Sequence, residues 1–269
     1  MQKQDIWRLL PLLAALLTVV CLLLTSANDA KPIPDDPPPT TLPPMEPNPY
    51  RAEDFTYDED GYLTCTAGES ILGIDVSSHQ GEIDWQQVKA AGIEFVMIRI
   101  GYRGYGSEGA IRTDPKAAEN YAGAKAAGLK IGGYFFSQAV SIEEAMAEAY
   151  FVLESVRFWD LDMPLVFDWE PMGDAARTAN MDARTLTDCA KIFCRVLKRA
   201  GHTPMLYFNL SLSRDLLYLE ELTDYDWWFA RYASEMKFDY RVTMWQYTRT
   251  GQVPGIDGEV DLNLWFPEE

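Results

Sequence analysis

Pro164-Leu165-Val166-Phe167-Asp168-Trp169-Glu170-Pro171 is the stretch that decides the fold and the chemistry. Its apolar part predicts a buried strand that runs directly into two acids spaced two residues apart. Because side chains at i and i+2 of a strand share a face, Asp168 and Glu170 should point together, with Cα atoms about 6.6 Å apart, while Trp169 points away. Two such carboxyl groups repel, and the drier one keeps its proton to a higher pH. The stretch therefore predicts an acid and a base in one site, unless the acids merely face solvent at a strand end.

The composition limits the classes of function. The 269 residues allow one large domain or two small ones, and 48% apolar with 13% aromatic content is enough for a sizeable core. The net charge of -18 argues against a nucleic-acid partner, because phosphate binding needs a basic surface. The two histidines, His79 and His202, and the dispersed cysteines form no zinc pattern, so no metal and no cofactor is expected.

An apolar run fills most of residues 1–27 and is preceded by Lys3 and Arg8, which predicts an export segment. The run is long for a cleaved signal, which favours an uncleaved anchor, although Thr25-Ser26-Ala27 offers a cleavage site. The downstream domain is therefore expected outside the cytoplasm, either anchored in the cell membrane or secreted.

Residues 28–68 are expected to form a Pro-rich acidic linker and a pre-domain segment. Proline, threonine and aspartate dominate up to about Pro49, a composition that favours extended conformations and a semi-rigid spacer. The acidic and aromatic residues that follow could form a short hairpin, turning at Asp60-Gly61, that packs on the next domain. Cys65 could reach another cysteine only if this segment folds back. Cys189 and Cys194, five residues apart on one helix, point about 140° apart and cannot form a bond.

Residues 69–269 alternate between strand-like and helix-like patterns. Strands are expected at residues 71–76, 95–100, 130–136, from 165, and at 205–208, 227–232 and 242–247. Helices are expected at residues 85–91, 115–127 (with Asp114 as its cap), 142–157 (opened by Ser141 and Glu144) and 186–200. Repeated strand, helix, strand units predict a parallel sheet, and about seven or eight strands predict a single irregular (β/α) barrel of the α/β class, TIM-barrel-like.

Barrels of this kind carry their chemistry at the C-terminal ends of the strands. Residues able to take part in a site fall late in successive expected strands: Asp75, Arg99, Tyr134, Asp168 with Glu170, Asn209, Arg231 and Gln246. A purely structural barrel has no reason to gather polar residues at one end, although a few would occur there by chance. The pattern therefore favours a site at this end.

Five segments add a more specific signal through their order and spacing. They are residues 73–81 with Ile83-Asp84-Trp85, residues 95–102, residues 127–134, Asp168-Trp169-Glu170, and residues 245–248 with 255–263. In these segments the chain resembles glycoside hydrolase family 25, the Chalaropsis-type muramidases that cleave bacterial peptidoglycan. The resemblance runs from Gly73 to Trp265. His79 departs from it, since many members carry Trp there, and we expect this histidine to pack its loop.

The resemblance implies that four acids line the cleft: Asp75, Asp168, Glu170 and Asp261. We expect Glu170 to be the general acid and Asp168 to be the stabiliser or nucleophile. The substrate would be the β-1,4 bond between N-acetylmuramic acid and N-acetylglucosamine, and the reaction should retain the anomeric configuration. The partners would be peptidoglycan glycan strands, and the membrane through the N-terminal segment, with the protein a monomer.

Eight further residues are expected to bind the sugar: Tyr134, Arg99, Tyr207, Asn209, Trp228, Arg231, Trp245 and Gln246. For the aromatic members, core packing is an equally good interpretation. Two other functions stay open. One is a wall-binding module that kept the fold and lost turnover, which the four acids argue against. The other is a chitinase-like hydrolase, whose longer D-x-x-D-x-D-x-E run is absent before Glu170.

Overall fold

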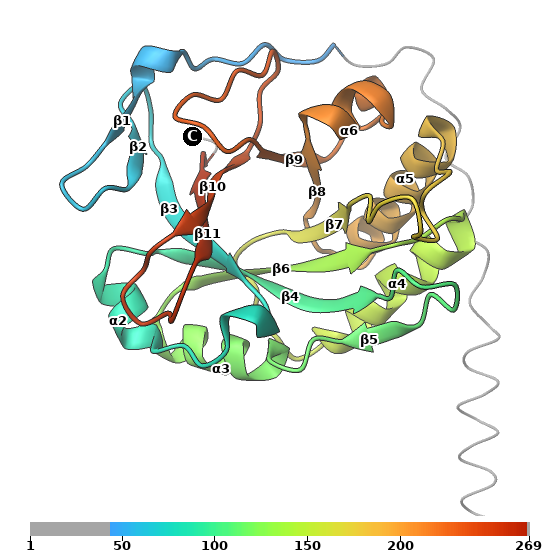
Figure 1. Ribbon diagram of the computed structural model, residues 1–269, viewed down its shortest axis with the longest axis horizontal. Coiled ribbons are helices and arrows are strands. Elements are labelled where there is room, and N and C mark those ends of the chain that lie inside the picture. Colours follow the sequence, from blue (N-terminus) through green and yellow to red (C-terminus); the bar gives the residue numbers. More distant parts are fainter. Residues whose placement is uncertain (1–43, 268–269) are drawn as a thin grey trace, which may run out of the picture. The chain divides into compact units, whose positions relative to one another are not determined.

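The computed structural model describes residues 44–267, so the expected export segment and most of the expected Pro-rich spacer lie outside the described residues. No helix within residues 44–267 combines the length and the apolar character needed to cross a membrane. The described residues form a mixed α/β fold built on a barrel (Figure 1).

The strands are β1 Phe55–Tyr57, β2 Leu63–Cys65, β3 Ile71–Val76, β4 Phe95–Arg103, β5 Ile111–Thr113, β6 Lys130–Ser137, β7 Leu165–Trp169, β8 Pro204–Asn209, β9 Asp226–Ala230, β10 Met244–Gly251 and β11 Val260–Trp265. The helices are α2 Trp85–Ala90, α3 Ala117–Ala127, α4 Ile142–Ser155, α5 Ala183–Arg199 and α6 Leu210–Asp215, with 3-10 turns at Ala52–Asp54, Ser78–Gln80 and Leu219–Glu221.

Within this described part, eight strands close the barrel in the order β3-β11-β10-β9-β8-β7-β6-β4, and β4 pairs back with β3. The expected barrel is thereby confirmed. The expectation of a purely parallel sheet is wrong at β11, a strand that the pattern missed, because β11 runs antiparallel to both neighbours. Residues 252–259, which join β10 to β11, contain no crossover helix, and such a short connection returns the chain in the opposite direction.

The barrel interior is filled by apolar side chains, which come from alternate strand positions and, at Met163, from the loop before β7. Its members are Ile71, Phe95, Met97, Tyr134, Met163, Val166, Met205, Tyr207, Trp228, Ala230 and Met244. Two inward positions are glycines because neighbours occupy their space. A Cβ on Gly73 would overlap the ring of Phe95, and one on Gly132 would lie 2.6 Å from the sulfur of Met97. Side chains thus fill the middle of the barrel.

Helices α3, α4 and α5 pack against the outside of β4, β6, β7 and β8 (Figure 1). Helix α4 begins as expected, with the Ser141 side chain accepting a hydrogen bond from the Glu144 amide. Helix α3 begins at Ala117 and not at Pro115, because residues 115–116 form a turn that the Ala117 amide closes on the Asp114 carbonyl, and the cap residue is Lys116. The Asp114 carboxylate accepts from the Lys116 amide and also pairs with Arg99. Asp114 therefore ties the start of this helix to β4.

The expected hairpin is confirmed and covers the barrel beside β10 (Figure 1). Strands β1 and β2 pair antiparallel, and the Phe55 ring meets the Trp245 ring edge-on at 5.0 Å. The Leu63 amide donates to the Tyr247 hydroxyl at 3.3 Å. The packed segment starts earlier than expected, since the Asn48 side chain donates to the Phe238 carbonyl. Although the segment folds back, Cys65 is free, as are Cys189 and Cys194.

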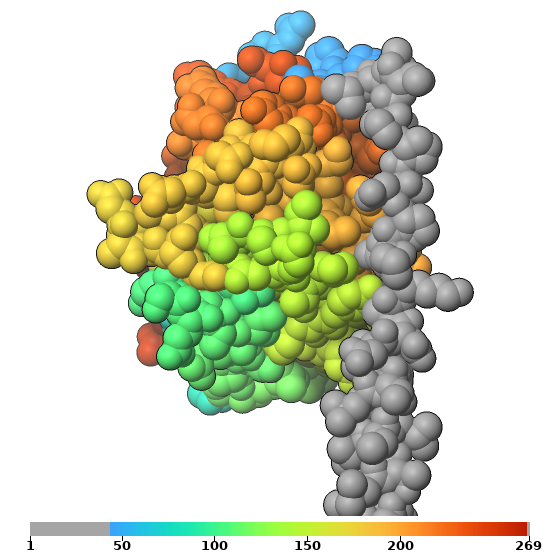
Figure 2. Space-filling model, turned by 90° about the vertical axis from the view of Figure 1, so that its right-hand side faces the viewer, coloured from blue at the N-terminus to red at the C-terminus, as the bar shows by residue number. Residues whose placement is uncertain are grey.

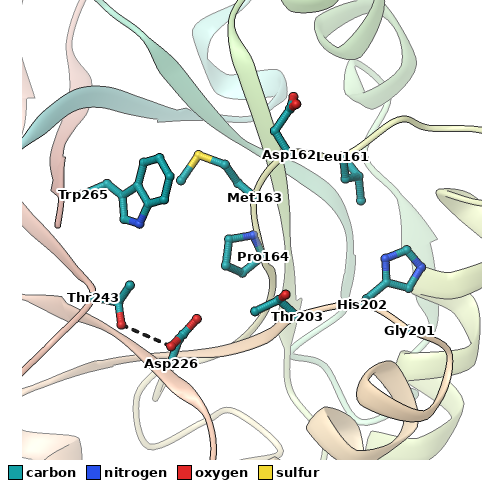
Figure 3. Close-up of a pocket in the computed structure, with 10 residues that line it drawn as sticks. All are labelled: Leu161, Asp162, Met163, Pro164, Gly201, His202, Thr203, Asp226, Thr243 and Trp265. Atoms are coloured by element: carbon teal, nitrogen blue, oxygen red, sulfur yellow. Dashed lines mark hydrogen bonds between the residues drawn. The ribbon is translucent and has the colours of Figure 1, made fainter. Parts of the chain in front are cut away.

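A cavity of about 300 Å³ lies at the end of the barrel where the parallel strands begin (Figure 3). It is lined by Leu161, Asp162, Met163, Pro164, Gly201, His202, Thr203, Asp226, Thr243 and Trp265. Its two carboxyl groups are engaged, Asp226 by the Thr243 hydroxyl at 3.3 Å and Asp162 by the Ile131 amide at 3.3 Å. Figure 3 shows these carboxyl groups on separate sides of the cavity, an arrangement unlike a carboxylate pair.

The docked hairpin predicts that Phe55→Ala lowers the free energy of unfolding by about 2 kcal/mol, less than truncation of a fully buried ring would cost. Tyr57→Ala is the matched control, since Tyr57 lies on the same strand and is 54% exposed, and it should change stability by less than about 0.5 kcal/mol. Urea denaturation of both variants measures the difference. Equal, small effects would contradict docking of the hairpin on the barrel.

Candidate active site

A cleft of about 200 Å³ opens at the C-terminal ends of the parallel strands. It is lined by Asp75, Ser77, His79, Gln80, Arg99, Tyr134, Phe136, Asp168, Glu170, Tyr207, Trp228, Tyr232, Gln246 and Asp261. Asp261 belongs to this end because β11 runs the opposite way, which puts its first residues beside the last residues of β3. Asp261 and Asp75 are partners in that register.

The D-x-E stretch is divided between the two faces of the sheet as the alternation predicts. Asp168 and Glu170 line the cleft, whereas Trp169 is buried on the other side and donates its indole N–H to the Ala139 carbonyl at 3.1 Å. Asp168 is 5% exposed, and its Oδ1 atom has no hydrogen-bond partner in the described part of the chain. A buried acceptor of this kind is available to a donor on a ligand.

Asp75 is the acceptor in a hydrogen-bond network that joins β3, β10 and β11. Its Oδ2 atom accepts from the side-chain amides of Gln246 at 2.7 Å and Asn263 at 2.9 Å. The indole of Trp228 can only donate, and it donates to Asn263 Oδ1 at 2.8 Å, which leaves the Asn263 amide N–H groups to face Asp75. Hydroxyls of Tyr207 and Tyr232 likewise donate to Gln246 Oε1. Both amides therefore present N–H groups to one carboxylate oxygen.

Burial raises the pKa values of all four carboxyl groups, and repulsion by neighbouring carboxylates adds to it at Asp168, Glu170 and Asp261. Burial raises the pKa of Asp75 to about 6, against the two amide donors, which lower it. Burial, followed by the charges of Asp75 and Glu170, raises the pKa of Asp261 to about 8. Burial and the neighbouring Glu170 charge hold the pKa of Asp168 well above its usual range. Burial and the Asp75 charge raise that of Glu170. The cleft therefore retains protons near neutral pH.

The backbone that carries Glu170 is fixed by a polar network on β6 and the following loop. The buried Gln138 side chain donates to the Glu170 carbonyl at 2.7 Å and accepts from the Thr178 hydroxyl at 3.1 Å. Arg177 donates to the Gln138 carbonyl and makes a two-point ion pair with Glu144 on α4. The loop between β7 and α5, yellow in Figure 2, projects from the surface, and these contacts tie it to the barrel.

Residues 74–256 match the family described as Glycosyl hydrolases family 25. The chain belongs to glycoside hydrolase family 25. It is 30% identical over 212 residues to YegX of Escherichia coli O6:H1, an alignment that covers 76% of this chain and 72% of YegX. It is also 30% identical over 195 residues to the autolytic lysozyme of Clostridium acetobutylicum, covering 72% of this chain and 55% of the lysozyme.

A solved structure shows the same fold. The modular autolysin LytC of Streptococcus pneumoniae, in complex with a synthetic peptidoglycan ligand, aligns with a TM-score of 0.67 at 24% identity. The alignment covers 79% of this chain and 50% of LytC, so the chain spans half the length of that structure. As a member of family 25, the chain is a glycoside hydrolase.

In this family 25 hydrolase the barrel brings most of the predicted site residues together. Those that line the cleft are Asp75, Asp168, Glu170, Asp261, Arg99, Tyr134, Tyr207, Trp228 and Gln246. Arg99 also forms an ion pair with Asp114 at 2.7 Å and donates to the Ser78 hydroxyl. Its charge lowers the pKa of Asp168, against the dominant effect of burial.

Three residues predicted to bind substrate do not line the cleft. Asn209 caps α6, accepting from the amides of Ser211 and Leu212. Arg231 donates to the carbonyl of Glu235 in its own loop. Trp245 is fully buried on the outer side of β10 under the hairpin, with its indole N–H on the Arg231 carbonyl at 2.9 Å. The alternation of strand side chains accounts for Trp245, because its neighbour Gln246 faces the cleft.

Several cleft residues were not predicted from the sequence as site residues. They are Ser77, His79, Gln80, Phe136 and Tyr232, with Asn263 behind them as a hydrogen-bond donor to Asp75. Asn263 carried a signal, since it lies two residues after Asp261 and so shares its face of the strand. His79 lies in the loop after β3, where its amide donates to the Ser77 hydroxyl. Among residues 44–267 no three His, Cys, Asp or Glu side chains are grouped to hold a metal ion.

The charge coupling predicts that Asp75→Asn lowers the pKa of Glu170. The substitution keeps an oxygen acceptor but removes the negative charge, which is the second cause of the raised value after burial. The pKa should still stay above its ordinary range, because burial is unchanged. Carbon-13 NMR titration of the Glu170 carboxyl measures it. The control is Asp257→Asn, which removes a charge from an exposed position in the β10–β11 loop and should leave the Glu170 pKa unchanged. An unchanged Glu170 pKa in Asp75→Asn would contradict the coupling.

Proposed function

We propose that this chain is a muramidase that hydrolyses the β-1,4 bond between N-acetylmuramic acid and N-acetylglucosamine in peptidoglycan. The observation that carries the proposal is the meeting of four carboxyl groups with raised pKa values in one cleft of a family 25 barrel. Membership of the family supports glycoside hydrolysis. The substrate class is supported by relatives named autolytic lysozyme and N,O-diacetylmuramidase.

Glu170 acts as the general acid in this proposal. Cleavage of a glycosidic bond requires a proton on a poor leaving oxygen, and the donor must still hold that proton near neutral pH. Burial and the charge of Asp75 raise the pKa of Glu170 in this direction. The Gln138 amide fixes the backbone at Glu170, so the carboxyl group is presented from a rigid position.

Asp168 stabilises, as the carboxylate, the positive charge that develops on the sugar ring, and a hydrogen bond from the substrate to its Oδ1 atom favours that ionised form. Its carboxyl group is on the same strand as the acid, two residues before it, whereas retaining enzymes with a carboxylate nucleophile need the two groups on opposite sides of the bond. The muramic acid substrate carries a 2-acetamido group that can itself attack the anomeric carbon. The unpartnered Asp168 Oδ1 supports this route, because the acetamido N–H would give it the hydrogen bond that the protein does not.

Asp75 and Asp261 adjust these two groups and orient the sugar in the proposed mechanism. The charge of Asp75 raises the pKa values of Glu170, Asp168 and Asp261. The rings of Tyr134 and Tyr207 pack edge-on against the buried Trp228 and form the cleft floor. Tyr232, 50% exposed at the rim, is the ring best placed to stack on a sugar face.

The site of action is a further part of the proposal. Peptidoglycan lies outside the cytoplasmic membrane, and the apolar run within residues 1–27 has the composition of an export segment. We propose that the hydrolase acts outside the cytoplasm, either anchored by this run or released after its cleavage. Fractionation of cells that express the full chain, followed by N-terminal sequencing, distinguishes anchoring, secretion and retention in the cytoplasm.

Glu170→Gln should lower kcat on purified peptidoglycan by about 10³-fold while binding of glycan fragments persists, since only the proton donor is lost. Glu94→Gln, an exposed change before β4 at the opposite end of the barrel, should keep wild-type activity. Release of reducing ends measures the rate, and calorimetry measures binding. Activity of Glu170→Gln within tenfold of wild type would refute its assignment. A wild-type chain that binds wall without releasing reducing ends would favour the wall-binding module.

Stereochemistry tests the assisted route. Proton NMR of the first-formed anomer should show retention of the anomeric configuration. A muramyl substrate without its acetyl group should be hydrolysed at least about 10²-fold more slowly, because the internal nucleophile is missing. Inversion would contradict the retaining mechanism. Full activity on the deacetylated substrate, or a covalent sugar trapped on Asp168, would replace assistance by direct attack.

A further inference from the structure

An exposed arginine stands at the rim of the cleft on the β10 side. The guanidinium carbon of Arg249 lies 5.5 Å from the centre of the Tyr232 ring, a distance typical of a cation–π contact. The hydroxyl of the same tyrosine donates to Gln246 inside the cleft at 3.2 Å. Tyr232 therefore reaches from the carboxylate network to Arg249 and places the cation next to the cleft.

The backbone of β10 explains why Arg249 reaches this position. The register between β10 and β11 shifts after Gln246 and again after Thr248, so the strand is bulged where it leaves the barrel. Bulges redirect side chains at the rims of barrels. Gln246 points into the cleft and the buried Tyr247 lies under the hairpin, while Arg249 extends into solvent beyond the bulge.

Arg249 is charged and available to a ligand. It forms no ion pair with a carboxylate in the described part of the chain, whereas the other cleft arginine, Arg99, is held by Asp114. Its charge acts on the cleft, because it lowers the pKa of Asp261 against the larger effect of burial. Stacking over a ring occupies one face of a guanidinium and leaves its N–H groups free for a planar anion.

We propose that Arg249 is a specificity-determining residue that binds a carboxylate carried by the muramic acid unit of the substrate. This inference rests on the proposed muramidase function. Those carboxyl groups of the cleft that are ionised repel an anionic glycan, and the cation of Arg249 at the rim offsets that repulsion at one place. N-acetylglucosamine has no carboxylate, so the contact favours the sugar that does. The carboxylate is either the free lactyl group or one on the attached peptide.

Steady-state kinetics on three glycans test the proposal: one with peptide stems, one whose stems have been removed to free the lactyl carboxylates, and one whose carboxylates have all been amidated. Arg249→Gln should raise KM about tenfold on the anionic glycan that supplies the contact, relative to its KM on the amidated glycan. Any change in kcat that arises from the effect of its charge on Asp261 should be the same on all three glycans. Arg249→Lys should recover part of the loss, because the charge remains while the planar fork is lost.

Arg157→Gln is the matched control, since it removes the same charge from the loop that leads into β7, at the opposite end of the barrel. It should leave KM unchanged on all three glycans. A loss confined to the stem-free glycan assigns the lactyl group, and a loss confined to the stem-bearing glycan assigns the peptide. Equal KM values for Arg249→Gln and wild type on every glycan would overturn the inference alone, whereas no cleavage by wild type would overturn the proposed function.

Discussion

The burial of several carboxyl groups at one end of the barrel is the constraint on which the rest of the site depends. Desolvation disfavours each charge, and the groups disfavour one another's ionisation. At Asp75 the two opposing effects can be compared directly, because two amide donors favour the anion and yet burial still raises the pKa to about 6. Desolvation therefore outweighs hydrogen bonding even at Asp75, whose Oδ2 atom accepts from two amides, and the site holds protons that exposed acids would release.

This arrangement opposes folding at neutral pH. The pKa of Asp261 rises from an ordinary 3.8 to about 8 in the folded chain, so the folded state binds the proton more tightly than the unfolded state does. Stability then falls as the pH rises through that interval. The apolar barrel interior, with Phe95 and Met97 filling the space at glycine positions, and the hairpin docked on Trp245 provide the packing that offsets this cost.

The sequence predicted the parts of the site that depend on local periodicity. Alternation along a strand was enough to place Asp168 and Glu170 on one face and Trp169 on the other. The same alternation along β10 also predicts that Gln246 and Trp245 lie on opposite faces, since adjacent residues of a strand cannot both face the cleft. Asn209 was misplaced for a different reason, because its side chain serves as a helix cap, a competing use that spacing along the strand does not reveal.

Local sequence patterns do not predict the direction in which β11 runs or the strands with which it pairs. Asp261 was expected in the cleft only from the family resemblance, because a rule that puts chemistry at the C-terminal ends of parallel strands excludes the first residues of a strand. The antiparallel return of β11 removes that conflict and also brings Asn263 to Asp75.

The clustered carboxyl groups keep a proton for catalysis, and the pH dependence of kcat/KM on peptidoglycan measures whether they do. Activity should persist at neutral pH and fall on an alkaline limb as the pH passes the raised pKa of the proton donor. An activity that disappears above about pH 4.5, the range of an unperturbed glutamic acid, would contradict it.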